Sequence, residues 1–316
     1  MTAHPDTPRP VVVGVDGSPH GQRALDWAAA EAELRGSPIV VLTAVPASYP
    51  TTRSGVPGEP RVQPSSALAI TAEHALTAAV DHVRLRHPDL DVSGHTVAGE
   101  PGDVLVEASG SAALVVVGAR GLGRVRGLLM GSVSSKVSAK AHCPTVVVRE
   151  APSRSLTDLR VVVGVDGSTD STQALRFAFD AASLRGTGLT VVHTWDVPWD
   201  EGTAPPDSEE AQQLEQRERA AVAQSVAGFA ADFPAVDVRR HVVRGHAVDE
   251  LVRQSANAAL LVVAARGRGT TRGLVLGSTS QEVLPGAHCP VAVITASAAT
   301  TSASAAPTES TQGARS

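Results

Sequence analysis

Cysteine, lysine and aromatic residues are scarce in this chain. Two cysteines in 316 residues do not make a disulfide framework, and no Cys-x-x-Cys pair is present for a zinc site. Aromatic side chains make up 3% of the residues, so a buried core must be built from Val, Leu and Ala. Only Lys136 and Lys140 are lysines among 27 basic residues, and the net charge is −5 with a pI near 6.1. This balance argues against a dedicated nucleic-acid-binding protein, which usually carries a basic excess.

Long apolar runs are also missing. Residues 114–118 and 260–265 are among the longest runs, and both are far too short to cross a bilayer. Residues 1–10 contain no basic segment followed by an apolar stretch, so no secretory signal is expected there. Together with the few cysteines, these absences predict a soluble protein in a reducing, cytoplasmic setting, with no membrane partner.

The sequence does contain a long internal repeat. Val-Val-Val-Gly-Val-Asp-Gly-Ser at 11–18 recurs at 161–168, and Ala-His-Cys-Pro at 141–144 recurs at 287–290. A hydrophobic content of 42% is enough for two cores, and a repeat of about 140 residues is too long for a solenoid. We therefore expect two copies of one domain, at 1–149 and 159–295. A polar linker is expected at 150–158, and the Ala/Ser/Thr-rich tail at 296–316 should be disordered.

Each copy alternates strand and helix patterns. In the first copy, runs rich in β-branched residues predict strands at 11–15, 39–45, 92–97, 114–117 and 145–148. A helix should begin at Pro19, with Ser18 as its N-cap, and end at Arg35-Gly36; others are expected at 67–86, from 102 and from 132. Strands separated by helices form parallel βαβ units with right-handed crossovers. The pattern predicts an α/β protein with two doubly wound, parallel five-stranded sheet domains in tandem.

The loop after the fourth strand has the composition of an anion site. It reads Gly118-Ala119-Arg120-Gly121, then nine residues, then Gly131-Ser132 at the start of a helix. Glycines let backbone amides approach an anion closely, and a helix N-terminus offers unpaired N–H groups. The plain alternative is a surface loop with a Gly-Ser helix cap. Because the same residues recur at the same spacing from Ala265 to Ser278, phosphate binding is the favoured reading.

Asp16 and Asp166 each follow a first strand. Ligands of doubly wound sheets bind outside the strand ends where the strand order reverses. If the order is 3-2-1-4-5, Asp16 and Gly118 face each other across that crevice. The alternative is that Asp-Gly-Ser only makes a turn and caps a helix. We favour ligand contact because the position at the reversal is independent support.

Other familiar sites are excluded or disfavoured. No Gly-Lys dipeptide exists for a Walker A loop, and the glycines at 121–127 have the wrong spacing for a dinucleotide fingerprint. The Ala-His-Cys-Pro sequences predict a turn into the last strand with a small buried thiol. His193 is expected to be a crevice or core residue, and Glu31, Asp180 and the charges at 209–219 are expected on solvated helix faces.

Together these motifs resemble the universal stress protein family. The resemblance rests on Gly-x2-Gly-x9-Gly-Ser before a helix, Val-Gly-Val-Asp-Gly-Ser near the start and Cys-Pro-Thr-Val or Cys-Pro-Val near the end, and it covers residues 9–149 and 159–295. It implies strand order 3-2-1-4-5 and ATP in the crevice, with which Mg²⁺ could enter. It also implies that the last strands, at 145–148 and 291–294, pair with each other. The two copies would then form an intrachain pseudo-dimer; a homodimer of whole chains stays open.

The resemblance also assigns contacts by position. Asp16 would meet the ribose or phosphates, Ala44 the adenine, residues 118–121 the ribose and phosphates, and residues 131–133 the terminal phosphates. The full set expected in the first copy is Gly14, Asp16, Ala44, Gly118, Ala119, Arg120, Gly121, Leu122, Gly123, Arg124, Gly131, Ser132 and Val133. The set expected in the second copy is Gly164, Asp166, Thr194, Ala264, Ala265, Arg266, Gly267, Arg268, Gly269, Gly277, Ser278 and Thr279.

One position departs from the family pattern. Ala264 stands where the first copy has Gly118, the first glycine of the motif. Its Cβ is expected to intrude on the nucleotide and to restrict φ, so the second site should bind more weakly.

Three classes of function fit these residues. The favoured one is a regulatory protein that senses or stores adenine nucleotide, and the family resemblance implies that it controls stress adaptation or growth. The alternatives are a slow ATPase or autokinase, and an adaptor that ignores nucleotides. Phosphoryl transfer needs a positioned nucleophile, a metal and charge clamps. Because no general base beyond Asp16 is evident, we assign no catalytic residues and no metal ligands, and the binding role is preferred.

Overall fold

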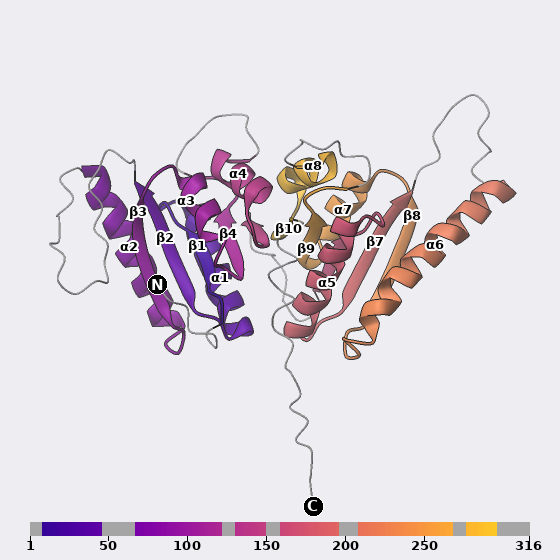
Figure 1. The fold of residues 1–316 in the computed structure, drawn as a ribbon, viewed down its shortest axis with the longest axis horizontal. Helices are drawn as coiled ribbons and strands as arrows, with labels where there is room; N and C mark the ends of the chain where they lie inside the picture. Colours follow the sequence, from indigo (N-terminus) through magenta and orange to yellow (C-terminus); the bar gives the residue numbers. More distant parts are fainter. Residues whose placement is uncertain are drawn as a thin grey trace, which may run out of the picture.

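The computed structural model describes residues 8–45, 67–121, 130–149, 159–195, 208–267 and 276–295. The expected linker at 150–158 and tail at 296–316 lie outside these ranges. Ten strands form one sheet in the order β3-β2-β1-β4-β5-β10-β9-β6-β7-β8 (Figure 1). Each half therefore has the order 3-2-1-4-5, and the predicted fold class is confirmed.

The first half follows the predicted alternation of strands and helices closely. Its elements are β1 (Val11–Gly14), α1 (Pro19–Arg35), β2 (Ile39–Val45), α2 (Ala67–Arg86), β3 (Val92–Ala98), α3 (Pro101–Ala108), β4 (Leu114–Gly118), α4 (Ser132–Lys140) and β5 (Thr145–Val148).

The second half repeats this succession. Its elements are β6 (Arg160–Gly164), α5 (Thr169–Leu184), β7 (Leu189–Trp195), α6 (Glu209–Ala230), β8 (Val238–Arg244), α7 (Ala247–Ser255), β9 (Ala258–Ala264), α8 (Ser278–Gly286) and β10 (Val291–Ile294). Within each half every strand pair is parallel.

Two apolar layers fill the space between the sheet and its helices. Helices α1, α2, α5 and α6 pack on one face, and α3, α4, α7 and α8 pack on the other. Valines alternate between the layers along β1, where Val11 and Val13 face the first layer and Val12 faces the second. Because both faces are covered, the strands read as continuous apolar runs in the sequence. No helix in the described ranges combines the length and apolar character that a membrane span needs.

The turns that precede α1 and α5 each depend on a glycine and a serine. Gly17 and Gly167 have φ of +76° and +75°, a left-handed conformation that glycine adopts without a Cβ clash. The Ser18 hydroxyl then accepts a hydrogen bond from Gly21 N at 3.0 Å and caps α1. These turns determine the direction in which the chain passes from β1 to α1 and from β6 to α5.

The two halves join through their last strands. β5 and β10 pair antiparallel, with Val146 opposite Ala292. The Thr295 hydroxyl donates to the Ala141 carbonyl at 3.0 Å, and Arg149 donates to the Leu284 carbonyl at 3.2 Å. This pairing confirms the contact that the family resemblance implied, and it leaves β3 and β8 as the two edges of the combined sheet.

Helices α1 and α5 form a second contact between the halves, and here the expectation for Glu31 was wrong. Its side chain is 1% exposed and accepts from Arg35 Nε at 2.7 Å and from Arg185 of the second half. Arg35 also pairs with Asp180 at 3.1 Å. Arg185 lies 5.9 Å from the ring centre of Trp27, on α1. Glu31 is buried because the second half supplies a cation for it, which the pattern of α1 alone does not reveal.

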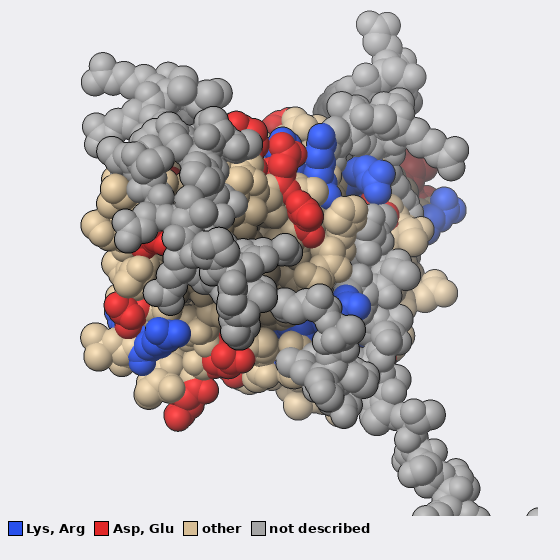
Figure 2. Space-filling model, turned by 60° about the vertical axis from the view of Figure 1, so that its left-hand side comes forward, with Lys and Arg blue, Asp and Glu red and all other residues tan. Residues whose placement is uncertain are grey.

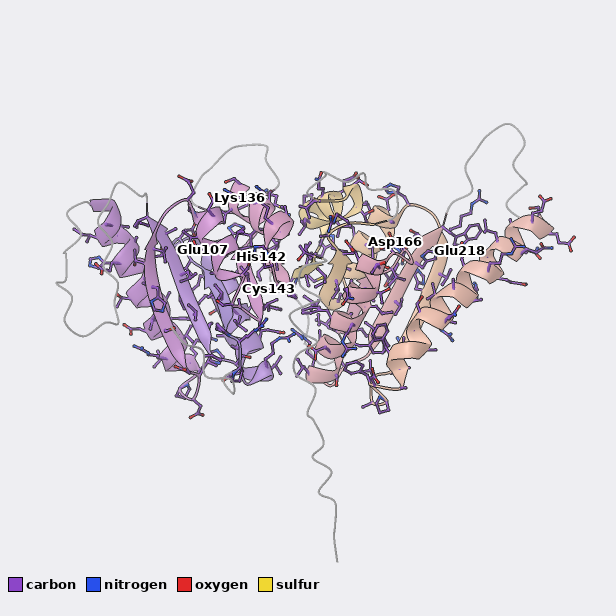
Figure 3. The ribbon with its side chains drawn as sticks, viewed as in Figure 1. Glu107, Lys136, His142, Cys143, Asp166 and Glu218 are labelled. Carbon is purple, nitrogen blue, oxygen red and sulfur yellow. The ribbon has the colours of Figure 1, made fainter. Side chains whose placement is uncertain are left out.

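The two cysteines lie where their strands begin. Cys143 is 1% and Cys289 0% exposed, at the turns leading into β5 and β10, which confirms the predicted buried thiols (Figure 3). Burial raises the pKa of each thiol to about 12, because an apolar surrounding disfavours the thiolate.

We predict that Glu31→Gln lowers the free energy of unfolding by about 3 kcal/mol, because it leaves two partly buried arginines without their carboxylate. Glu33→Gln is the matched control on the same helix. Its carboxylate is 49% exposed and pairs only with His87 among the ion pairs seen, so the loss should stay under about 1 kcal/mol. Chemical denaturation followed by circular dichroism measures both. Equal small losses would show that the buried pair does not hold the halves together.

We also predict that both thiols resist alkylation in the folded protein at pH 8. A rise in pKa from 9.0 to about 12 lowers the thiolate fraction about 1000-fold. Iodoacetamide should label neither thiol in native protein over an hour and both after unfolding in guanidinium. Rapid labelling of one cysteine in the native state would contradict the burial of that residue.

Candidate functional site

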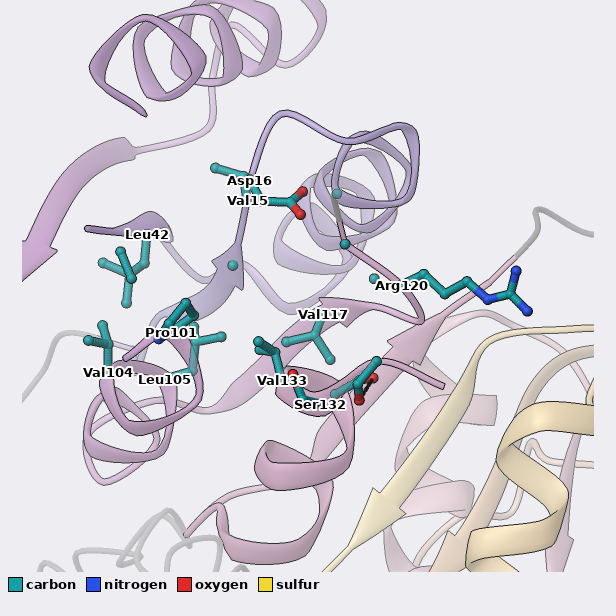
Figure 4. A pocket seen from close by; sticks show the side chains of 17 residues that line it. Val15, Asp16, Leu42, Pro101, Val104, Leu105, Val117, Arg120, Ser132 and Val133 are labelled. Carbon is teal, nitrogen blue, oxygen red and sulfur yellow. Dashed lines mark hydrogen bonds between the residues drawn. The ribbon is translucent and has the colours of Figure 1, made fainter. Parts of the chain in front are cut away.

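The first candidate site lies where the strand order reverses, between β1 and β4. A cavity of about 320 Å³ opens at the carboxyl ends of these strands (Figure 4). It is lined by residues from both strands and from the helices on either side: Gly14, Val15, Asp16, Gly21, Leu42, Ala44, Pro101, Val104, Leu105, Val117, Gly118, Arg120, Gly121, Gly131, Ser132, Val133 and Ser134. The loop after β4 and the start of α1 thus meet across one crevice, as the sequence predicts.

One end of this cavity is apolar. Leu42, Val104, Leu105 and Val117 belong to the packed layer under α3 and α4, and Pro101 begins α3 beside them. Figure 4 shows Leu42, Pro101, Val104 and Leu105 gathered on the side of the cavity away from Arg120, with Val117 nearer its middle. A flat, weakly polar group such as a purine suits this wall, because the wall offers apolar surface without competing charges.

The opposite end is formed by backbone groups. Gly131 N donates to the Ala119 carbonyl at 2.9 Å, and the Ser134 hydroxyl donates to the Gly131 carbonyl at 3.0 Å. These bonds close the loop and aim the first turn of α4 at the cavity. The capping residue Gly131 has no side chain to bond the N–H groups of that turn. A helix end with this construction favours an anion through its N–H groups and its dipole.

Glycine is required where the loop passes Asp16. A Cβ on Gly121 would lie 2.6 Å from Asp16 Oδ2, and one on Gly267 would lie 2.5 Å from Asp166 Oδ2. Both distances are shorter than real carbon–oxygen contacts. The carboxylate and the loop backbone are therefore neighbours at the mouth of each site.

Asp16 forms the turn and also lies at the cavity, so its position is compatible with both interpretations of its sequence context. Its Oδ1 accepts from Ser18 N at 3.0 Å, which is the turn-forming role. Its carboxylate also lines the cavity. The turn thus holds the carboxylate at the ligand side of the crevice, so the two interpretations are compatible.

The second half repeats the cavity with a volume of about 250 Å³. It is lined by Gly164, Val165, Asp166, Ser171, Val192, Thr194, Ala247, Leu251, Val263, Ala264, Arg266, Gly267, Gly277, Ser278, Thr279 and Ser280. Asp166 lies at its mouth (Figure 3) and accepts from Ser168 N at 2.9 Å. Gly277 N donates to the Ala265 carbonyl at 2.7 Å, so the loop is closed as in the first half.

The wall of the second cavity is more polar. Thr194 lines it where the first cavity has Ala44. Glu250 stands at the sequence position of Val104, but it is not one of the residues that line the second cavity. Glu250 Oε1 lies 2.7 Å from His241 Nε2 and 2.6 Å from Arg253 Nη2. Burial alone would raise the pKa of Glu250, but hydrogen bonds from Arg253 and Gln254, with the nearby positive charges, lower it. This carboxylate is therefore ionised and held by its own neighbours.

The structure corrects the expected effect of Ala264. A Cβ at Gly118 would point at the backbone of His20 on α1, 2.8 Å from its carbonyl carbon, and not into the cavity. Ala264 likewise packs on the α5 side of the sheet. Because successive side chains of a strand alternate between faces, Val263 packs on the α7 side and the Ala264 methyl on the α5 side, although Ala264 still lines the cavity at the end of β9. No residue other than glycine has positive φ in the described ranges, so Ala264 is not strained either.

Most of the residues predicted from the sequence line one of the two cavities. Ala119 and Ala265 do not; they are buried in the layer beneath, and their carbonyls hold the loops closed. Leu122, Gly123, Arg124, Arg268 and Gly269 lie outside the described residues. The sequence reading missed the apolar wall from α3, chiefly Val104 and Leu105. No motif in the sequence indicates this wall, because it depends on how α3 packs against the strands.

His193 is buried beside the second site, on the other face of the sheet. Its Nδ1 lies 2.8 Å from the Val165 carbonyl and its Nε2 lies 2.8 Å from Glu218 on α6. This is a core position, one of the two that its sequence context allowed. Within the described ranges, no group of three or more His, Cys, Asp or Glu side chains is arranged to hold a metal ion.

The surface charges are mixed in sign on the face of the molecule that Figure 2 shows. Among the residues drawn in colour, acidic and basic side chains lie interspersed and are separated by uncharged residues. His20, in the first turn of α1, lies within electrostatic reach of Arg23, Arg120 and Arg149, and of these Arg120 lines the cavity. Burial, followed by these three charges, lowers the pKa of His20, while Asp16 acts in the opposite direction.

Comparison with known proteins agrees with this architecture. The universal stress protein family model matches residues 8–149 and again residues 159–295. Universal stress protein Rv2623 of Mycobacterium tuberculosis is 36% identical over 295 residues, which cover 90% of this chain and 95% of that protein. A universal stress protein of Mycolicibacterium smegmatis is 34% identical, with coverage of 90% and 96%.

Solved structures share the whole fold at lower identity. The crystal structure of a universal stress protein from Archaeoglobus fulgidus has a TM-score of 0.61 and 20% identity, and the match covers 92% of this chain and 97% of that one. The duplicated family model and the full-length relatives lead to one conclusion: the chain is a tandem member of the universal stress protein family.

Proposed function

We propose that this protein binds adenine nucleotide, with ATP as the ligand of its first cavity, and that the binding serves a regulatory role in stress adaptation or growth control. The observation that carries the proposal is the 320 Å³ cavity with an apolar wall at one end and the N-terminus of α4 at the other. A nucleotide has the same division into an apolar base and an anionic tail.

Different lining residues would contact the base, the ribose and the phosphates of such a ligand. Leu42, Val104 and Leu105 would cover the base. The Asp16 carboxylate would accept a hydrogen bond from a ribose hydroxyl. The phosphates would lie against the loop glycines and the first N–H groups of α4, where the amides and the helix dipole stabilise negative charge.

Magnesium fits the same arrangement as a companion of the phosphates. Mg²⁺ prefers oxygen ligands and keeps several waters, so one carboxylate and the phosphates suffice to hold it. Among the described lining residues, Asp16 and the Ser132 hydroxyl are the oxygen ligands we propose for it, since the Ser134 hydroxyl already bonds the Gly131 carbonyl.

Binding is favoured over turnover because of how the carboxylate is used. Among the residues that line the first cavity, Asp16 is the one carboxylate, and the Ser18 N–H already fixes its Oδ1. A general base for hydrolysis would need a position from which to orient water against the terminal phosphate. Asp16 is better placed for the ribose and the loop.

We predict that Ser132→Pro combined with Ser278→Pro removes ATP binding without unfolding either helix. Proline is tolerated at the first helical position, and the preceding Gly131 and Gly277 are extended, with ψ of 155° and 157°. Each change deletes one N–H and one hydroxyl at the proposed phosphate end. Losing bonds to a charged group should weaken binding at least about tenfold. At 100 times the wild-type Kd, ATP stabilises by about 2.7 kcal/mol, and the variant should gain at most about half of that.

Thr169→Pro is the matched control. It places proline at the first position of α5, where α1 already has Pro19, and Thr169 does not line the second cavity. This variant should show the wild-type shift of melting temperature with ATP. An absent shift in the wild type, or an unchanged one in the double variant, would overturn the proposal. Chromatography of the bound nucleotide after several hours separates the alternatives, because steady release of ADP indicates an ATPase.

A further inference from the structure

The two halves share hydrogen bonds beyond the pairing of β5 with β10. Directly after β10, the Thr295 hydroxyl donates to the carbonyl of Ala141, the residue that caps the C-terminal end of α4. Directly after β5, the Arg149 guanidinium donates to the Leu284 carbonyl in the last turn of α8. Thr295 and Arg149 occupy the same position of the repeat, at the offset of 146 residues. Each half therefore holds the C-terminal end of one helix of the other half.

Those two helices form the phosphate ends of the proposed nucleotide sites. Helix α4 begins at Ser132 and α8 at Ser278, and each serine lines its cavity. Each helix has nine residues, so about 13 Å separates its cavity end from the end that the other half holds. Packed helices shift as rigid elements. A shift at the phosphate end of either helix therefore also displaces its other end.

The carbonyl held on α8 is one that the helix itself leaves unpaired. A continued helix would pair the Leu284 carbonyl with the N–H of His288, four residues on. His288 N instead donates to the Ser255 hydroxyl at 2.9 Å, so the first half supplies the donor. Both held carbonyls are secluded, since Leu284 is 1% and Ala141 2% exposed. Water cannot readily replace these two cross-half bonds, and their loss would leave buried acceptors unpaired.

The residue that holds α4 is joined to the loop of the second cavity. Ala265 N donates at 2.8 Å to the carbonyl of Ile294, which directly precedes Thr295. The Ala265 carbonyl accepts from Gly277 N at 2.7 Å and from the Ser280 hydroxyl at 3.1 Å, and these bonds close the loop. A change in the conformation of this loop is therefore transmitted to Thr295 through one hydrogen bond and one peptide bond.

The first half makes the same connection in the opposite direction. Ala119 N donates at 2.9 Å to the carbonyl of Val148, which directly precedes Arg149. The Ala119 carbonyl accepts from Gly131 N at 2.9 Å and from the Ser134 hydroxyl at 3.3 Å. Two hydrogen-bonded routes thus run between the cavities, one from the second loop to α4 and one from the first loop to α8.

We propose that Thr295 and Arg149 are positioning residues that couple the two nucleotide sites, so that ligand bound in one cavity raises the affinity of the other. The coupling rests on the nucleotide binding proposed above and adds its regulation. The loop-closing bonds and the cross-half bonds are formed together in the structure. A first nucleotide that lies against one closed loop stabilises this arrangement and lowers the ordering cost of binding the second, which is positive cooperativity.

ATP binding to the full chain measures this coupling. Ser132→Pro leaves the second site alone able to bind, and Ser278→Pro leaves the first. The coupling factor is the overall constant for binding two ATP to the wild type, divided by the product of the two single-site constants of these variants. It should be about 5 or more, and by linkage each site changes the affinity of the other by this same factor. Calorimetry gives the constants and the number of ATP bound per chain.

Removing the cross-half donors tests the assignment of the two residues. Thr295→Val with Arg149→Met removes both donors, and in this background the coupling factor should fall to about 1. Thr295→Ser with Arg149→Lys keeps a donor at each position and should restore the factor to at least about half of its wild-type value. A residue that only stabilised the fold would change the melting temperature and leave this factor unchanged.

Thr187→Val with Arg185→Met is the matched control. The Thr187 hydroxyl donates to the Leu159 carbonyl at 2.7 Å, before the first residue of β7 and so at the end of the sheet away from the cavities. Arg185 bonds Glu31 of the other half, but neither residue is attached to α4 or α8. This variant should lose stability and keep the wild-type coupling factor.

Failure of the coupling is distinct from failure of nucleotide binding. If the wild type binds no ATP, the proposed function is wrong, and the coupling with it. If it binds one ATP per chain, or two with a coupling factor of about 1, nucleotide binding stands and the coupling is wrong. A factor that persists in Thr295→Val with Arg149→Met, or that the control abolishes equally, would overturn the assignment of Thr295 and Arg149.

Discussion

The reversal of strand order between β1 and β4 is the constraint on which the rest of this molecule depends. The two strands are hydrogen-bonded neighbours, yet β1 leads to α1 on one face of the sheet while the chain after β4 reaches α4 on the other. The connections diverge where the strands end, so a crevice opens between them. The Asp-Gly-Ser turn and the glycines after β4 meet at this crevice because they directly follow the two strands between which the order reverses.

Duplication places two such crevices in one continuous sheet. The β5–β10 pairing removes one edge from each half, which reduces the unpaired backbone that an isolated domain would expose (Figure 1). The α1–α5 contact then adds charge to this joint, since Glu31 of one half is neutralised by Arg35 and by Arg185 of the other. A buried carboxylate with a cation from each half favours one relative placement, because any other would leave it uncompensated.

The fold was predictable from the sequence because parallel strands buried on both faces appear as uninterrupted Val-rich runs, and because Ser18-Pro19 and Gly36 mark helix ends by known chemistry. The backbone side of the site was equally predictable, since glycine and serine at fixed spacing act through main-chain geometry. Side-chain environments were harder. Glu31 was misjudged because its partner is 154 residues away along the chain. The apolar wall from α3 was missed because it depends on packing between elements. The direction of the Ala264 side chain was misjudged, although the alternation of side chains along a strand predicts it. Val263 packs on the α7 side of the sheet, so the methyl of the next residue points to the α5 side.

Side chains and backbone therefore contribute to these sites in different ways. The loop closures through Ala119 and Ala265, the glycines beside Asp16 and Asp166, and the exposed first turns of α4 and α8 are nearly the same in both halves. Such features depend on main-chain conformation, and changing any one of them would disturb the turn as well as the ligand site. The charged side chains beside each cavity lie on helix surfaces and after strand ends, where exchange of His20 for Asp170 or Arg149 for Thr295 leaves the fold intact. A duplicated domain can thus keep the same main-chain loops at both crevices while the side-chain charges beside each crevice change independently in each copy.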